Sequence, residues 1–222
     1  MQIQTTINID DVADFVTKAI LEKLRSQKRV LFFATGGSSI AVCVRIAEIF
    51  REEKDQDIFK NLVVTLTDER YGEVGHKDSN WTELLAKGFS INNAHLIPVL
   101  IGGDLETTVK SFSKNLEIEL QKADYKIGLF GVGTDGHTAG ILPESGAVFA
   151  DDLVFGYNTP TFLRITITLQ MIEKLDQAVV FMQGKEKWPV LQDLKTIIEI
   201  SKQPAQILKK VPSLTIFTDY KK

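Results

Sequence analysis

The sequence predicts an α/β fold: a mostly parallel, doubly wound β-sheet with helices on both faces. Short apolar runs, such as residues 29–35 (RVLFFAT) and 62–66 (LVVTL), alternate with longer segments of helical periodicity. Strands that are apolar along their whole length are typical of parallel sheets buried on both faces, and the helices supply the crossovers. The chain contains no internal repeat and no linker rich in Pro, Gly or Ser. We therefore expect a single domain over residues 1–222.

The first half of the chain is expected to begin with a helix. Asp10 or Asp11 can cap a helix that runs to about Arg25, with apolar residues at helical spacing. Pro98 favours an edge position for the strand that contains it, because proline cannot donate to the sheet ladder. The elements expected after the first helix are a strand at 29–35, a helix at 39–52, and strands at 62–66 and 95–101.

The second half continues the alternation of helices and strands. Asp104 can cap a helix that runs to about Lys122. Residues 164–168 (RITIT) alternate like a half-exposed strand. The remaining expected elements are strands at 126–132, 177–182 and 214–218 and a mostly helical segment at 185–199.

Composition and charge narrow the class of protein. The chain is 44% hydrophobic, which excludes a predominantly disordered state. A net charge of −3 gives no broad electrostatic footprint for nucleic acid or an anionic membrane. The single cysteine, Cys43, excludes an intramolecular disulfide and a cysteine-based zinc site, and the three histidines are scattered. With no secretory signal and no apolar run of about 20 residues, we expect a cytoplasmic monomer or weak homo-oligomer with no metal, nucleic acid or membrane partner.

In doubly wound folds ligands bind beyond the carboxyl ends of the strands, so the residues that follow each strand are the candidates. The first strand is followed by Gly36, Gly37, Ser38 and Ser39. The glycines allow close approach of a ligand, while the serine hydroxyls and the N–H groups of the next helix can bind phosphate. The segment lacks the Lys-Ser/Thr ending of a Walker A loop. The alternative is an ordinary turn capped by serine.

The second strand is followed by Asp68, Glu69 and Arg70, and Asn80 comes soon after. Three charged residues at the end of a strand are more than a turn requires. Asp68 and Glu69 can orient sugar hydroxyls or a catalytic base, and Arg70 can pair with phosphate or a developing oxyanion. The alternative is a solvated acidic turn in which Asn80 caps the following helix.

Residues 131–139 (GVGTDGHTA) match the dinucleotide-binding pattern G-x-G-x-x-G. We reject that reading because the match lies past the middle of the chain, Pro143 interrupts any following helix, and no acidic residue closes a second strand about 20 residues later. What remains is a glycine-rich loop carrying Asp135 and His137. The glycines, including Gly133, favour close approach of a ligand, so we expect His137 to be a general acid or base rather than a structural residue.

Two basic residues in the second half can reach a phosphate. Arg164 starts a predicted strand, and Lys187 lies in a strand-to-helix turn. The alternative for each is an ordinary surface charge.

Together these segments resemble the 6-phosphogluconolactonase family, within the wider glucosamine-6-phosphate isomerase/deaminase superfamily. The Asp-Glu-Arg segment and the DGHTA string followed by Leu-Pro are similar to the lactonase branch. Glu144 stands where lactonases commonly have glycine, and residues 72–78 (GEVGHKD) lack the usual Val-Pro. The resemblance implies a Rossmann-like sheet of the NagB/RpiA type. The segments occur in the family's order: 35–39, 67–80, 128–143, 163–172 and 179–191.

The resemblance implies hydrolysis of 6-phospho-D-glucono-1,5-lactone to 6-phospho-D-gluconate, in the oxidative pentose phosphate pathway, with no metal or organic cofactor. His137 would activate a water, with Asp135 or Asp68 holding its imidazole, and Arg70 with the N–H groups near Gly36 and Gly37 would stabilise the oxyanion. The expected substrate contacts are Gly36, Gly37, Ser38, Ser39, Glu69, Asn80, Gly133, Arg164 and Lys187.

Two other functions stay open. A glucosamine-6-phosphate deaminase would need a ring-opening acid near His137, which Glu144 alone can supply. A non-catalytic sugar-phosphate-binding module would not need His137.

Overall fold

The computed structural model describes residues 1–221 and contains a seven-stranded sheet in which every neighbouring pair is parallel. The strand order is β1-β10-β9-β6-β2-β3-β5. This confirms the predicted α/β class. The strands are β1 (Gln2–Thr5), β2 (Val30–Ala34), β3 (Leu62–Leu66), β5 (His95–Leu96), β6 (Tyr125–Phe130), β9 (Gln177–Met182) and β10 (Ser213–Thr218).

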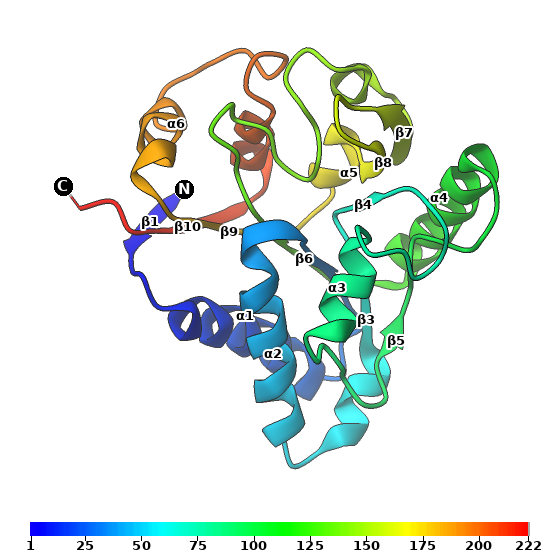
Figure 1. Ribbon diagram of the computed structural model, residues 1–222. Helices are drawn as coiled ribbons and strands as arrows, with labels where there is room; N and C mark the ends of the chain where they lie inside the picture. The colour runs from blue at the N-terminus through cyan, green and yellow to red at the C-terminus, as the bar shows by residue number, and fades with distance from the viewer. Residues whose placement is uncertain (222) are drawn as a thin grey trace.

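Helices cover both faces of this sheet (Figure 1). Helices α1 and α2 pack side by side on one face, and α5 and α6 lie on the other. The cap of α1 is Asn8, whose side chain accepts a hydrogen bond from the Asp10 N–H at 3.0 Å, so the predicted cap at Asp10 or Asp11 is wrong by two or three residues. The bounds are α1 (Ile9–Arg25), α2 (Ile40–Glu52), α3 (Asn80–Ala86), α4 (Leu105–Lys122), α5 (Leu169–Ile172) and α6 (Trp188–Asp193).

The direction of winding reverses at the centre of the sheet. From β2 the chain moves to β3 and β5 on one side, and it then returns to β6 on the other side of β2. Strands β2 and β3 are buried along their whole length, as their continuous apolar runs predict. The loops that leave β2 and β6 separate above this point, which is where doubly wound folds bind ligands.

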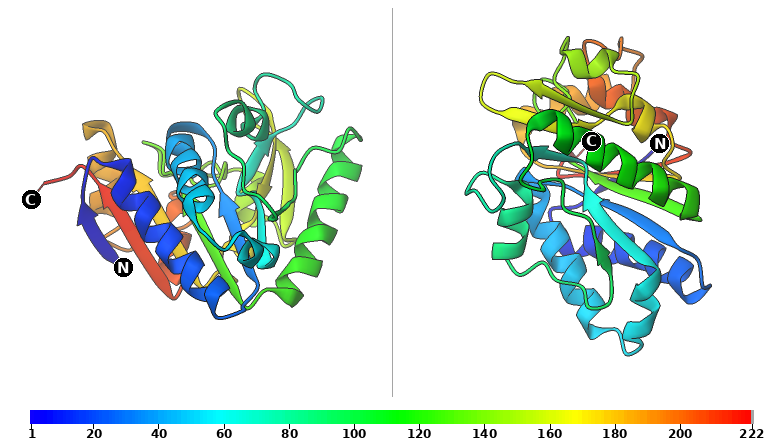
Figure 2. Two further views of the ribbon diagram at one scale, coloured as in Figure 1. Left: turned by 90° about the horizontal axis from the view of Figure 1, so that it is seen from below. Right: turned by 90° about the vertical axis from the view of Figure 1, so that its right-hand side faces the viewer.

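A second, antiparallel sheet lies beside the large one and was not predicted. It has the order β4-β8-β7, with β4 (Asp68–Arg70), β8 (Leu163–Ile167) and β7 (Val154–Asn158). The strand predicted at 164–168 belongs to this small sheet. Figure 2 shows it next to α4, which packs against β7.

Three further elements differ from prediction. Strand β1 was missed because its four residues are all exposed and form no apolar run. Strand β5 covers only two residues of the predicted 95–101, although it lies at the edge, as Pro98 indicated. The helix expected at 185–199 is a short 3₁₀ turn followed by α6, which ends at Asp193. Ile197 is 98% exposed while Leu194 is buried, so the apolar residues after α6 do not form one continuous helical face against the core.

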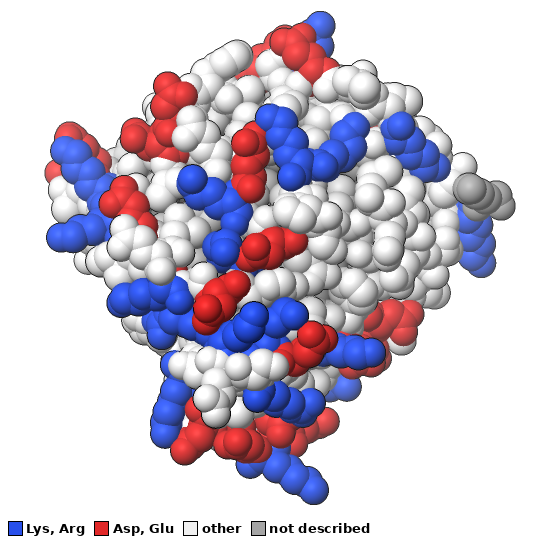
Figure 3. All heavy atoms as spheres, turned by 180° about the vertical axis from the view of Figure 1, so that it is seen from behind, with Lys and Arg blue, Asp and Glu red and all other residues white. Residues whose placement is uncertain are grey.

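Charged side chains of both signs are interspersed on the face shown in Figure 3. Every helix within residues 1–221 is too short or too polar to cross a bilayer.

Candidate active site

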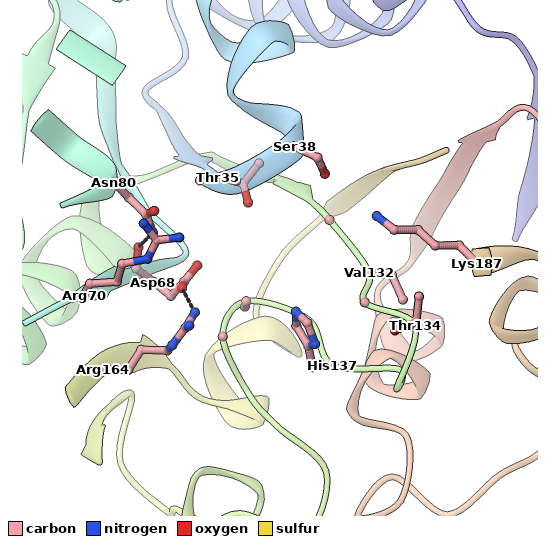
Figure 4. Close-up of a pocket in the computed structure, with 16 residues that line it drawn as sticks. Thr35, Ser38, Asp68, Arg70, Asn80, Val132, Thr134, His137, Arg164 and Lys187 are labelled. Atoms are coloured by element: carbon pink, nitrogen blue, oxygen red, sulfur yellow. Dashed lines mark hydrogen bonds and ion pairs between the residues drawn. The ribbon is translucent and has the colours of Figure 1, made fainter. Parts of the chain in front are cut away.

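A cavity of about 380 Å³ opens beyond the carboxyl ends of β2 and β6, with the small sheet forming one of its sides (Figure 4). It brings together residues that lie far apart in the sequence. Its lining includes ten of the thirteen residues expected at the site: Gly36, Gly37, Ser38, Asp68, Arg70, Asn80, Gly133, His137, Arg164 and Lys187.

His137 lies between the two sides of this cavity and is held by Asp135. Its Nδ1 is 2.6 Å from Asp135 Oδ1, and the same oxygen accepts a hydrogen bond from the His137 backbone N–H at 3.0 Å. Burial raises the pKa of the Asp135 carboxyl, but the His137 N–H and imidazole outweigh that effect, so its pKa lies below the usual value. Asp135 does not line the cavity; it orients the imidazole from outside.

Gly133 makes room for this imidazole. A Cβ at position 133 would overlap the ring of His137 and lie 2.7 Å from Asp135 Oδ1. The loop therefore needs glycine at position 133 as well as histidine at position 137, because only glycine lets the imidazole pack against the backbone.

The segment after β2 forms the neighbouring side of the cavity. Gly36 has no space for a side chain, because a Cβ there would lie within 2.6 Å of Asn80 Nδ2. Ser38 faces the cavity, and the backbone at 37–39 forms a short 3₁₀ turn that leads into α2. Ser39 is fully buried and does not line the cavity, contrary to expectation.

The small sheet contributes an ionic side. Asp68 Oδ2 and Arg164 Nη1 form a largely buried ion pair at 2.7 Å. Arg70 lies directly opposite Arg164 in the β4–β8 register, and no carboxylate pairs with it within residues 1–221. Its Nη1 instead donates to the Asp78 carbonyl at 3.0 Å, and its guanidinium stacks on Phe162 with 4.7 Å to the ring centroid. Of the two carboxylates expected to hold the His137 imidazole, Asp135 contacts it, whereas Asp68 pairs with Arg164.

Unpartnered polar atoms gather at this place. Within residues 1–221, seven buried side-chain nitrogen or oxygen atoms lack a hydrogen-bond partner, and four of them belong to residues in or next to the cavity: Ser39 Oγ, Arg70 Nε, Asn80 Oδ1 and Arg164 Nε. Buried polar groups are normally satisfied. A ligand with both an anionic group and hydroxyl groups would supply acceptors for Arg70 and Arg164 and a donor for Asn80, whereas Ser39 lies behind the cavity wall.

Glu69 is the clearest departure from the expected site. It was expected to contact a sugar, but it is fully buried and does not line the cavity. Burial raises the pKa of its carboxyl, and hydrogen bonds from Trp81, Asn80, Arg70 and Ser79 oppose that rise.

The last charged residue of the cavity is Lys187, whose ammonium extends into it from the side opposite Arg70 and Arg164. Glu144 is exposed and does not line the cavity. Residues 1–221 contain no cluster of three or more His, Cys, Asp or Glu suited to a metal ion. Thr35 and Thr134 also line the cavity, although they were not among the expected site residues. Both lie next to the expected glycines in the segments 35–39 and 131–139, and that position was the available signal.

The family model of glucosamine-6-phosphate isomerases/6-phosphogluconolactonase matches residues 5–216. The chain belongs to this family. A probable 6-phosphogluconolactonase of Dictyostelium discoideum is 25% identical over 94% of the chain and 92% of that protein. A 6-phosphogluconolactonase of Neisseria meningitidis is 29% identical over 80% of the chain and 78% of that protein.

The fold is shared with solved structures of both branches of the family. A 6-phosphogluconolactonase of Thermotoga maritima superposes with a TM-score of 0.82 at 20% identity, over 98% of each chain. A monomeric glucosamine-6-phosphate deaminase superposes with a TM-score of 0.79 at 17% identity, over 98% of this chain and 97% of that one. The fold therefore does not distinguish the two reactions, which depend on the residues that line the cavity.

Proposed function

We propose that the chain hydrolyses 6-phospho-D-glucono-1,5-lactone to 6-phospho-D-gluconate. One observation carries the proposal: the cavity places the Asp135-supported imidazole of His137 between Lys187 on one side and Arg70 and Arg164 on the other. A base flanked by cations suits a substrate with a phosphate at one end and an ester carbonyl at the other. The named lactonases among the relatives support the same reaction.

His137 acts as the general base in this proposal. When its Nδ1–H donates to Asp135, Nε2 is free to accept a proton from a water in the cavity. The oxygen of that water bonds to C1 of the lactone, and the C1 carbonyl becomes a tetrahedral oxyanion. As the oxyanion collapses, the bond from C1 to the ring oxygen breaks, and His137 returns its proton to that oxygen. A lactone is an activated ester, so we propose that a positioned base suffices without a metal.

The cations divide between the two ends of the substrate. Arg70, with the N–H groups near Gly36 and Gly37, stabilises the oxyanion, where the loss of one donor typically costs about 10²–10³ in rate. Lys187 and Ser38, which lie on the same side of the cavity, bind the phosphate, and its binding energy orients the carbonyl toward the water. Arg164, expected from the sequence to reach the phosphate, lies beside Arg70 and supports the carbonyl end instead. Asn80 Oδ1 accepts from a sugar hydroxyl. We place the enzyme in the cytoplasm, as a monomer or weak oligomer.

The test is a lactonase assay with substrate generated in situ and the spontaneous rate subtracted. We expect His137→Ala to lower kcat by about 10²–10⁴-fold. His95→Ala is the matched control, because His95 is exposed on the edge strand and does not line the cavity. A chelator should leave the wild-type rate unchanged, and loss of activity with chelator would contradict the metal-free step. A folded wild type that does not accelerate hydrolysis would overturn the proposal.

Because a glucosamine-6-phosphate deaminase has a similar fold, the second assay measures ammonia release from glucosamine 6-phosphate. The exposed position of Glu144, off the cavity wall, leaves that reaction without the acid the sequence offered. A binding module would bind 6-phosphogluconate equally well with and without His137 and would show no turnover.

A further inference from the structure

Glu69 connects two segments behind the cavity. Its Oε1 accepts hydrogen bonds from the backbone N–H groups of Arg70 at 2.7 Å and Asn80 at 2.6 Å. Its Oε2 accepts from the Ser79 hydroxyl at 2.9 Å and the Trp81 N–H at 3.0 Å. One carboxylate therefore ties β4 to the first turn of α3, across the loop at 71–78.

Each of the two segments carries a side chain of the cavity. Arg70 follows Glu69 directly, and Asn80 is the first residue of α3. The Asn80 amide packs over Gly36 and donates to the Asp68 carbonyl at 3.0 Å. Arg70 Nε and Asn80 Oδ1 are two of the buried, unpartnered atoms of the described chain. Because Arg70 lies on β4 and Asn80 on α3, a shift of α3 relative to β4 would change the spacing of these two atoms at the cavity.

The contact requires a carboxylate rather than a side chain of the same shape. All four partners donate, and three of them are backbone N–H groups that cannot reverse their polarity. A glutamine would place an NH₂ group at one of the two oxygen positions, where at least one backbone N–H would lose its acceptor. The Ser79 hydroxyl alone could turn to accept.

We propose that Glu69 is a positioning residue, which holds Arg70 and Asn80 at the cavity from behind without contacting substrate. The kinetic test of this role rests on the proposed lactonase activity. The role itself rests on the four hydrogen bonds.

The first variant is Glu69→Gln, and we expect it to lower kcat/KM by at least about 10-fold, because small displacements of positioning groups have large effects on rate. Glu119→Gln is the matched control. Glu119 is also a buried glutamate, 4% exposed, but it pairs with Arg29 at 2.6 Å and does not line the cavity. We expect the control to lower the melting temperature and to leave kcat/KM within about 2-fold.

A double-mutant cycle separates positioning from general destabilisation. If Glu69 acts through its neighbours, the factor by which Glu69→Gln lowers kcat/KM should be at least about 3-fold smaller in the Asn80→Ala background than in the wild type. The same is expected in the Arg70→Lys background. Additive effects in both cycles would overturn the proposal. So would a folded Glu69→Gln protein with wild-type kcat/KM.

A fluorescence measurement keeps the test independent of turnover. The chain has two tryptophans, so Trp188→Phe leaves Trp81 as the single probe. The backbone N–H of Trp81 donates to Glu69, so its indole reports on this part of α3. In that background we expect Glu69→Gln to increase acrylamide quenching of Trp81. An inactive wild type would overturn the proposed function, whereas unchanged quenching would overturn the role of Glu69.

If Glu69→Gln does not fold, Ser79→Ala replaces it in each measurement. This variant removes one of the four donors and leaves the three backbone N–H groups, and it also removes the cap that Ser79 Oγ provides to the Thr82 N–H of α3. The same changes are expected at smaller amplitude, and additive cycles would again count against the proposal.

Discussion

The cavity has two kinds of wall, and they are built on different principles. The wall from the large parallel sheet consists of the loops after β2 and β6, where backbone and small residues approach closely. The wall from the small antiparallel sheet consists of charged side chains, with Asp68, Arg70 and Arg164 on β4 and β8. The first wall depends on the absence of side chains. The second depends on a balance of charge, since one carboxylate faces two guanidinium groups.

The two walls should therefore fail in different ways. An added methyl group should damage the backbone wall through steric overlap, with a loss of rate. A removed charge should damage the ionic wall through an unpaired partner, with a loss of stability.

Among changes that test the contrast between the two walls, Gly133→Ala is expected to have the largest effect. The new Cβ would overlap the His137 ring, so either the imidazole or the loop must move. We expect kcat to fall by about 10²-fold, as for other displacements of catalytic groups. Steady-state kinetics beside a melting curve would measure it.

Gly146→Ala is the control for that prediction. Its Cβ would meet only the Phe155 ring, at 3.4 Å and beyond, and Gly146 does not line the cavity. Since this alanine would not displace a residue of the cavity, we expect little change in rate for this variant. A Gly133→Ala enzyme with wild-type kcat would show that the loop adapts and that the close packing has no catalytic consequence.

The ionic wall gives the next largest effect. Asp68→Ala leaves Arg164 without its carboxylate, and Arg164→Met leaves Asp68 without its guanidinium. Each should lower the free energy of unfolding by about 2 kcal/mol, less than for a fully buried pair because Arg164 keeps some exposure.

Urea unfolding of the two single variants and the double variant would measure the coupling. We expect the double variant to lose about 1–3 kcal/mol less than the sum of the single losses. Strictly additive losses would mean that the interaction between Asp68 and Arg164 contributes nothing to the free energy of unfolding. The proposed difference between the two walls would then not hold.

The backbone wall was more predictable from sequence than the ionic wall. Its signals are local: an apolar run followed directly by glycines and a functional side chain places Gly36, Ser38 and His137 at strand ends. Parallel strands then bring those ends to one edge of the sheet without further information.

The ionic wall depends on pairing between distant segments. Strand β4 has three residues and pairs with β8, nearly a hundred residues later, so no local pattern reveals the register that opposes Arg70 and Arg164. The inward turn of Glu69 follows from the same geometry. Alternate residues of a strand face opposite sides, so Asp68 and Arg70 face the cavity while Glu69 points behind it. Had residues 68–70 been assigned to a strand, this alternation would have indicated the burial of Glu69.

The smallest effect concerns Cys43, beneath the backbone wall. This residue of α2 is fully buried, and its thiol contacts the Thr35 carbonyl at 3.6 Å. Burial raises the pKa of the thiol to about 12, so at pH 8 the reactive thiolate is nearly absent. We expect iodoacetamide to label the native protein about 100-fold more slowly than the unfolded chain, at a rate set by local opening.

Cys43→Ala should keep kcat/KM within about 2-fold, because the side chain packs below the loop and faces no ligand. Rapid labelling of the native enzyme would mean that α2 opens readily. A helix that opens so readily could not keep the loop before it in place, and the close backbone packing at Gly36 would be lost.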